Sequence, residues 1–175
     1  NLGGGSVWPL ETLSAVAAMA KKNNLIVHMD GARLMNAVVA SGISAQDYAA
    51  YTDTAWIDLS KGLGCPIGGV LTGSTEFIEE AWYWKQRLGG AMRQSGMMAA
   101  AGLFALENNV SRLEEDHENA RILGERLADI DGIDINLSNI QTNLIFLNFQ
   151  MLMICWHIEG QTIQVFGLVK INKHF

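Results

Sequence analysis

The sequence predicts an α/β protein in which helices flank a mostly parallel sheet. Short apolar, β-rich runs alternate along the chain with helical patterns, which is the order expected when crossover helices connect parallel strands. An acid at position 30 and a lysine at position 61 follow the ends of two successive predicted strands. The 175 residues are 49% apolar, which is enough for a sizeable core. These observations favour one α/β domain with part of another.

The elements of the first half follow from apolar spacing and from turn residues. Pro9 precedes apolar residues at helical spacing, and Lys21 and Lys22 favour the end of that helix. The run LIVHM is typical of a buried parallel strand, which an Asp-Gly pair then ends. We therefore expect helices at residues 10–22, 33–40 and 45–51, and strands at residues 25–29, 54–58 and 68–73.

The second half is mainly helical in pattern. Acidic residues follow Ser74, where they favour the N-terminus of a helix. The segment GGAMRQSG breaks that helix, and a run of small residues then predicts a closely packed one. We expect helices at residues 74–88, 97–106 and 110–129, and a strand at residues 142–149.

Charge and cysteine content exclude several classes of function. The net charge of −6 and the pI near 5.1 leave no basic stripe for nucleic acid. Cys65 and Cys155 form no CxxC pair and no His/Cys group, so we predict neither a disulfide framework nor a metal site. We expect packed thiols in a reducing, cytoplasmic setting. No apolar run is long enough to span a bilayer, so we expect no membrane partner.

Asp30, Arg33 and Lys61 are the candidate site residues. In open α/β sheets, functional groups collect beyond the carboxyl ends of the strands, and one crossover separates this acid from this lysine. Pyridoxal phosphate suits such a set: the lysine forms a Schiff base, the acid keeps the pyridine nitrogen protonated, and the arginine lies beside the phenolic oxygen. Glycines around the lysine would let the backbone pass close to a flat cofactor.

Each of these signals also has an ordinary structural interpretation. An Asp before Gly at the end of a strand commonly forms a turn, a loop lysine is commonly a solvated charge, and an arginine at a helix start commonly lies on the surface. The run GLGCPIGG also resembles a dinucleotide-binding loop. Such a loop opens a helix, whereas this run precedes the strand-like GVLTG, which disfavours that interpretation.

Four motifs in order make the sequence resemble the low-specificity L-threonine aldolases. They are HMDGARLMNA, DLSKGLGCPIGGVL, LGGAMRQSG and EDHENAR, and the opening NLGGGSVWPLETL is similar to a glycine-rich segment of that family. These aldolases are pyridoxal-phosphate enzymes of the aspartate aminotransferase fold (fold-type I), and the resemblance runs to about residue 148. It implies that residues 1–105 are part of the large cofactor-binding domain. Residues 106–175 would be a linker helix and the start of a small C-terminal domain.

The resemblance implies a role for each candidate residue. Lys61 would be the Schiff-base lysine, Asp30 the partner of the pyridine nitrogen and Arg33 the neighbour of the phenolic oxygen. Arg93 would lie at the cofactor edge, in its own site or in that of a neighbouring subunit; the alternative is a charge satisfied by nearby carbonyls. We interpret His28 as structural, because it precedes the acid on a strand and is expected to face the opposite side.

The implied reaction is reversible cleavage of a β-hydroxy-α-amino acid. It gives glycine and acetaldehyde from L-threonine or L-allo-threonine and requires no metal. The implied partners are the amino-acid substrate and further copies of the chain, in a homodimer or homotetramer. His117 lies among acids, and we interpret it as part of a solvated helix face.

The chain departs from the family pattern at both ends. Family members carry a segment before residue 1 that cradles the cofactor phosphate and supplies a histidine that stacks on the ring. Residues 149–175 are atypical, with only Glu159, Lys170 and Lys173 as charged residues, and no arginine follows Arg126 to bind a substrate carboxylate. We therefore expect the chain as given to be an incomplete, inactive fragment. Another fold-type I β-eliminating lyase and a non-catalytic remnant subunit remain as alternatives.

Overall fold

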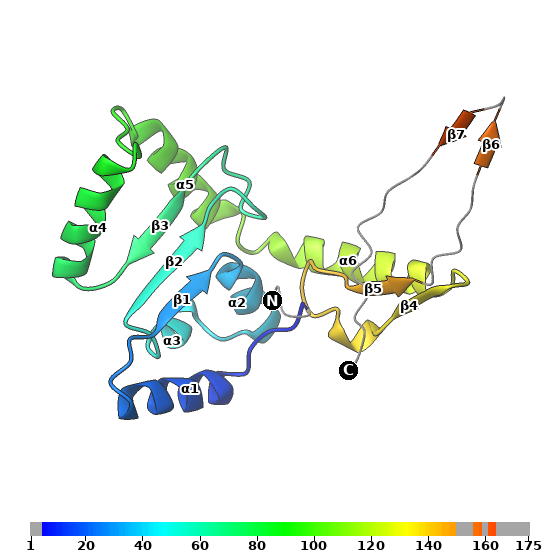
Figure 1. Cartoon of the computed structure of the whole chain (residues 1–175), viewed down its shortest axis with the longest axis horizontal. Helices are drawn as coiled ribbons and strands as arrows, with labels where there is room; N and C mark the ends of the chain where they lie inside the picture. Colours follow the sequence, from blue (N-terminus) through cyan, green and yellow to red (C-terminus); the bar gives the residue numbers. More distant parts are fainter. Residues whose placement is uncertain (1–4, 150–155, 159–160, 164–175) are drawn as a thin grey trace.

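In a computed structural model, the chain forms a three-stranded sheet with helices around it and a second, smaller layer beside one long helix (Figure 1). The structure describes residues 5–149, 156–158 and 161–163. The described helices are α1 (Leu10–Lys22), α2 (Leu34–Ser41), α3 (Ala45–Ala49), α4 (Thr75–Arg87), α5 (Gly96–Asn108) and α6 (Leu113–Ala128), with a 3₁₀ turn η1 (Leu137–Asn139). The described strands are β1 (His28–Gly31), β2 (Thr54–Asp58), β3 (Gly69–Thr72), β4 (Ile133–Ile135), β5 (Leu147–Phe149), β6 (Trp156–Ile158) and β7 (Gln161–Ile163).

The sheet that positions the candidate site has the order β1-β2-β3. β1 runs parallel to β2, with His28 opposite Thr54, whereas β3 runs antiparallel to β2, with Gly69 opposite Asp58. The predicted α/β class is confirmed, but the described sheet is mixed rather than mostly parallel. The reason is the connection at residues 59–68, which contains no helix, because a parallel return would need a longer crossover.

The helix boundaries follow the capping signals in the sequence. α1 begins directly after Pro9, whose extended backbone suits the start of a helix, and it ends with Lys21 and Lys22 in its last turn. α4 begins after Ser74, whose Oγ accepts a hydrogen bond of 3.2 Å from the Phe77 N–H. The helices predicted at residues 10–22 and 74–88 are therefore confirmed to within a residue.

Two strand predictions need correction. The strand predicted at residues 25–29 begins only at His28, because the backbone groups of Val27 are hydrogen-bonded to Asp53 instead of to a strand. The Val27 N–H donates to Asp53 Oδ2 at 2.8 Å, and the Asp53 N–H donates to the Val27 carbonyl at 2.9 Å. The strand predicted at residues 142–149 shortens to β5, which pairs antiparallel with β4, a strand that the sequence did not predict. Most of the atypical segment 149–175 lies outside the described residues.

Two hydrophobic clusters form the core of the described chain. The first joins the connection after β2 to α5 and to the start of α6, and it contains Leu59, Leu63, Cys65, Ala105 and Leu113. The second lies beneath α1 and contains Leu13, Leu34 and Tyr48. Burying one leucine side chain contributes about 1.5–3 kcal/mol, so the first cluster anchors the chain on both sides of Lys61. The predicted packing of the Cys65 thiol is confirmed.

The long helix α6 connects the three-stranded sheet to the smaller layer, which is formed by β4 and β5 (Figure 1). It packs against α2 on the sheet side and against β4 on the other side. Across the first contact, the side chains of Asn36 and His117 are hydrogen-bonded, Nδ2 to Nε2, at 3.1 Å. The division of the chain into domains at residue 105 stays a prediction. No helix among the described residues has both the length and the apolarity to cross a bilayer.

Candidate active site

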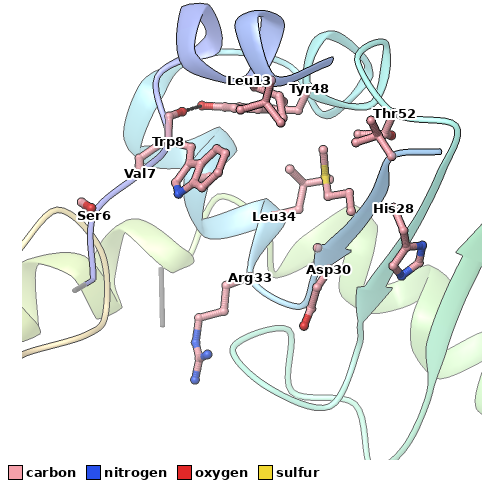
Figure 2. Close-up of a pocket in the computed structure, with 15 residues that line it drawn as sticks. Ser6, Val7, Trp8, Leu13, His28, Asp30, Arg33, Leu34, Tyr48 and Thr52 are labelled. Carbon is pink, nitrogen blue, oxygen red and sulfur yellow. Dashed lines mark hydrogen bonds between the residues drawn. The ribbon is translucent and has the colours of Figure 1, made fainter. Parts of the chain in front are cut away.

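Asp30 and Arg33 lie where β1 passes into α2. Asp30 is the third residue of β1, and its Oδ1 accepts a hydrogen bond of 3.1 Å from the Ala32 N–H, so the acid does help to form the turn. Arg33 is the residue directly before α2. Figure 2 shows the Asp30 carboxylate and the Arg33 guanidinium extending to the same side, away from the apolar side chains of Leu13 and Tyr48. The structure therefore brings this acid and this arginine together.

A cavity of about 330 Å³ lies between α1, β1 and α2. Its wall is mainly apolar and its polar groups lie along β1 and at the start of α2 (Figure 2). The residues that line it include Trp8, Leu13, Leu34 and Tyr48 on the apolar side and His28, Asp30 and Arg33 on the polar side. An apolar cavity with a few convergent polar groups is the usual form of a small-molecule site.

The Arg33 side chain lacks one hydrogen-bond acceptor in the described chain. Its Nε is buried and has no hydrogen-bond partner among the described residues. A buried N–H without an acceptor costs on the order of 1–3 kcal/mol, so such groups are nearly always paired in native proteins. An acceptor from a ligand, or from another segment of chain, would remove this cost.

Lys61 lies in the turn after β2 and lines a cleft together with Arg33. Its Nζ lies 2.8 Å from Asp58 Oδ2 and 5.7 Å from the centroid of the Trp56 ring. The Lys61 side chain is 37% exposed and the Asp58 side chain 14%. Arg33, Asp58 and Lys61 line one narrow cleft, which shares Gly31, Arg33 and Leu34 with the larger cavity. Lys61 and Arg33 thus meet in the cleft, and Asp30 and Arg33 meet in the adjoining cavity.

Asp58 is the member of this site that sequence reasoning missed. The Lys61 ammonium is the main group that lowers its pKa, to about 2, and the Ser60 hydroxyl and N–H act in the same direction. Both Ser60 groups donate to Oδ1, at 2.7 Å and 2.8 Å, while Oδ2 pairs with the lysine. The available signal was an acid three residues before the lysine, a spacing at which a tight turn brings two side chains together.

The turn that carries Lys61 is fixed by its neighbours in α5 and α6. The side-chain amide of Asn109 donates to the Leu63 carbonyl at 2.8 Å. A Cβ at Gly62 would lie 2.7 Å from Leu113 Cδ2, so glycine at this position lets α6 pack against the turn. The structure thus gives Gly62 a packing role. The expected close approach of this backbone to a cofactor stays a prediction.

Arg93 is separate from the other candidates. It is exposed in the turn before α5 and is not among the described residues that line either cavity. Its assignment to a cofactor edge stays a prediction. No group of three or more His, Cys, Asp or Glu side chains in the described ranges is arranged to hold a metal ion.

The expected face of His28 and the expected solvation of His117 need correction, whereas the structural role of His28 stays a prediction. His28 and Asp30 are two residues apart on β1, so the strand period places them on the same face, and both line the cavity. His28 Nδ1 lies 2.8 Å from Thr54 Oγ1 on β2. His117 is half-buried against Asn36 rather than part of a solvated face, and this burial lowers its pKa, against the opposing effect of Asp116 and Glu114.

Comparison with known proteins identifies the family. The sequence pattern of the beta-eliminating lyases matches residues 1–150, which is most of the chain. The chain belongs to the beta-eliminating lyase family. This membership confirms the resemblance that the four motifs indicated.

Among its relatives, the low specificity L-threonine aldolase of Escherichia coli is 44% identical over 147 residues, covering 84% of this chain and 43% of the relative. The low-specificity L-threonine aldolase 1 of Arabidopsis thaliana is 40% identical over 147 residues, covering 84% and 41%. The chain therefore spans about two fifths of the length of the curated relatives that it matches.

Solved structures of the family share the fold. A crystal structure from Exiguobacterium sp. 255-15, provisionally assigned as an aromatic amino acid beta-eliminating lyase/threonine aldolase, superposes with a TM-score of 0.75 at 25% identity. The match covers 83% of this chain and 41% of that chain. It confirms that these residues form part of a beta-eliminating lyase fold.

Proposed function

We propose that this chain carries the lysine, the acid and the arginine of a pyridoxal-phosphate-dependent aldehyde-lyase that cleaves L-threonine and L-allo-threonine to glycine and acetaldehyde. The observation that supports this most is the place of Arg33, which lines the cleft together with Lys61 and the adjoining cavity together with Asp30. Asp30 lies near the end of β1, and Lys61 follows β2, the strand that runs parallel to β1. The names of the Escherichia coli and Arabidopsis relatives support the substrate.

The residues present fit pyridoxal phosphate. Lys61 offers a primary amine for covalent attachment, and Asp30 offers an exposed carboxylate for the ring nitrogen. The buried Nε–H of Arg33, which has no acceptor within the described residues, would be satisfied by the phenolic oxygen. When bound, the group supplies an electron sink for the pair of electrons released as the Cα–Cβ bond of the substrate breaks.

The chain's own side chains would orient and polarise this group. The Ala32 N–H occupies Oδ1 of Asp30, which leaves Oδ2 to accept a proton-bearing nitrogen. The Arg33 cation offsets negative charge on an oxygen beside it. The apolar wall that includes the buried side chains of Leu13 and Leu34 excludes water from one side of the cavity, and charge interactions are stronger where water is excluded.

Two alternatives stay open. A β-eliminating lyase with another substrate is favoured by the double name of the Exiguobacterium structure. A non-catalytic remnant subunit is the second alternative. The three possibilities differ in their products and in cofactor binding. An aldolase releases acetaldehyde from L-threonine, a β-eliminating lyase releases pyruvate and ammonia from L-serine or L-cysteine, and a remnant binds no yellow cofactor.

The test is a chimera in which the matched segment of this chain replaces the corresponding segment of the Escherichia coli relative. We expect acetaldehyde release from L-threonine, and we expect Lys61→Ala to abolish it. Lys85→Ala, which changes a lysine on α4 outside the cleft, is the matched control and should retain activity. Pyruvate release from L-serine without acetaldehyde would contradict the aldolase assignment. A folded, colourless chimera would favour the remnant.

Three further expectations accompany this proposal. The complete protein is a homodimer or a homotetramer, which analytical ultracentrifugation of the chimera tests. It acts in the cytoplasm. The 175-residue chain alone releases no acetaldehyde from either threonine diastereomer, because orientation of a bound substrate supplies several kcal/mol of barrier lowering and no late arginine is present to bind its carboxylate.

A further inference from the structure

Asp58 and Lys61 form an ion pair whose acid is itself held in place. Asp58 is the last residue of β2, and its side chain is only 14% exposed. Ser60 donates twice to Oδ1, which aims Oδ2 at the lysine Nζ 2.8 Å away. The ring of Trp56 lies 5.7 Å from the same nitrogen, and an aromatic face also favours a cation. The flexible lysine side chain is therefore fixed from two directions.

We propose that Asp58 is a positioning residue, which holds the Lys61 amine at one place in the cleft until a carbonyl ligand takes the amine. An amine attacks a carbonyl or acyl carbon only through its unprotonated form. The ion pair with the Asp58 carboxylate must open before the amine reacts, so Asp58 restrains the reactivity of Lys61 as well as its position. This inference rests on the proposed function only in taking Lys61 as the reactive amine.

Other charged groups also face this pair. Arg33, at the start of α2, lines the same cleft and disfavours a second cation there. Asp116 on α6 approaches the turn from the other side, with Oδ2 3.6 Å from the place of a Cβ at Gly62. Asp58 alone among these groups is within hydrogen-bond distance of Lys61 Nζ in the described chain. Replacing Asp58 should therefore change the reactivity of the Lys61 amine more than replacing any other of these charged groups.

The test measures acetylation of Lys61 by dilute acetic anhydride, with peptide mass spectrometry and Lys21 as the internal reference. At pH 7 we expect the Lys61/Lys21 rate ratio to rise about fivefold in Asp58→Asn, the size of effect expected when a partly exposed ion pair is lost. Ser60→Ala, which removes one of the two bonds that aim the carboxylate, should raise the ratio about twofold. Asp134→Asn, at an exposed position on β4, should leave it unchanged.

The pH profile separates charge from packing. Near pH 11, where ordinary lysine amines are mostly unprotonated, the difference between Asp58→Asn and the parent chain should largely disappear. Equal ratios at pH 7 would overturn the proposal. A rise that persists undiminished at pH 11 would also overturn it, because looser packing alone would then explain the reactivity.

The same samples test the proposed function separately. Incubation with pyridoxal phosphate and borohydride marks any lysine that binds the cofactor covalently. Failure to mark Lys61, together with the fivefold change in acetylation, would contradict the cofactor role and leave the positioning role supported.

Discussion

Gly31→Ala is expected to disturb both the sheet and the site. Gly31 is the last residue of β1 and lies opposite Ile57 of β2. A Cβ at this position would lie 2.4 Å from the backbone carbonyl oxygen of Trp56, whereas real Cβ atoms keep at least 3.0 Å. β1, which carries Asp30, would have to move away from β2, which leads to Lys61, by about 0.6 Å or more.

The size of the effect follows from the kind of atom that must move. Overpacking a core costs about 1–3 kcal/mol. A clash with the backbone between two paired strands should cost close to the upper end of this range, because no side chain can rotate away. Replacing glycine with alanine also stabilises by about 0.4–1 kcal/mol through the unfolded chain. We therefore expect Gly31→Ala to lower the free energy of unfolding by about 2 kcal/mol.

The assay is urea unfolding of the 175-residue chain followed by far-UV circular dichroism, with midpoint and slope fitted separately. Gly96→Ala is the matched control. Gly96 is the first residue of α5, and nothing lies within 4 Å of an added Cβ. The control should be neutral or slightly more stable. A loss below about 0.5 kcal/mol in Gly31→Ala, at an unchanged slope, would refute the clash as the reason for glycine at this position.

Three further predictions concern stability. The pKa of Asp58 is about 2 in the folded chain and 3.8 ordinarily, so the ionised acid stabilises the fold above about pH 4 and this stabilisation is lost as the pH falls towards 2. After allowance for the exposure of Lys61, we expect the free energy of unfolding to fall by about 1 kcal/mol between pH 5 and pH 2.5, as measured by urea unfolding. Asp58→Asn should lose this part of the pH dependence. Burial lowers the pKa of His117 in the folded chain, so the unfolded chain takes up this proton at a higher pH than the folded chain does. The free energy of unfolding should therefore fall as the pH drops below about 6.5, and His117→Gln should remove this pH dependence. Ser74→Ala should cost about 1 kcal/mol, because the Phe77 N–H loses its cap; a cost near zero would contradict the capping role.

The sequence predicted those elements that local signals define. α1 and α4 were predictable because Pro9 and Ser74 mark their starts, and β2 was predictable because its apolar run is bounded by turn residues. The start of β1 was not predictable, because the contact between Asp53 and Val27 that delays it joins segments 26 residues apart. The antiparallel direction of β3 follows from the short connection after β2, which contains no helix.

For the candidate site, the sequence indicated which residues would lie near one edge of the sheet but not which contacts they make. The order of acid, arginine and lysine along an α/β chain indicated a common edge of the sheet, where Lys61 and Arg33 do line one cleft. The Asp58–Lys61 pair depends on the fold of the turn, so a strand pattern alone could not reveal it. His28 was assigned to the wrong face by a miscount of the strand period, since residues two apart share a face.

Covalent capture at Lys61 tests the central claim most directly. The 175-residue chain is incubated with pyridoxal phosphate, reduced with sodium borohydride and digested, and each lysine peptide is quantified by mass spectrometry. We predict that the pyridoxyl group accumulates on Lys61 in clear excess over Lys21 and Lys85, and that Lys61→Ala loses this product without gaining it elsewhere. Equal labelling of all three lysines, or preferential labelling of one outside the cleft, would contradict the assignment of Lys61 as the cofactor-binding amine.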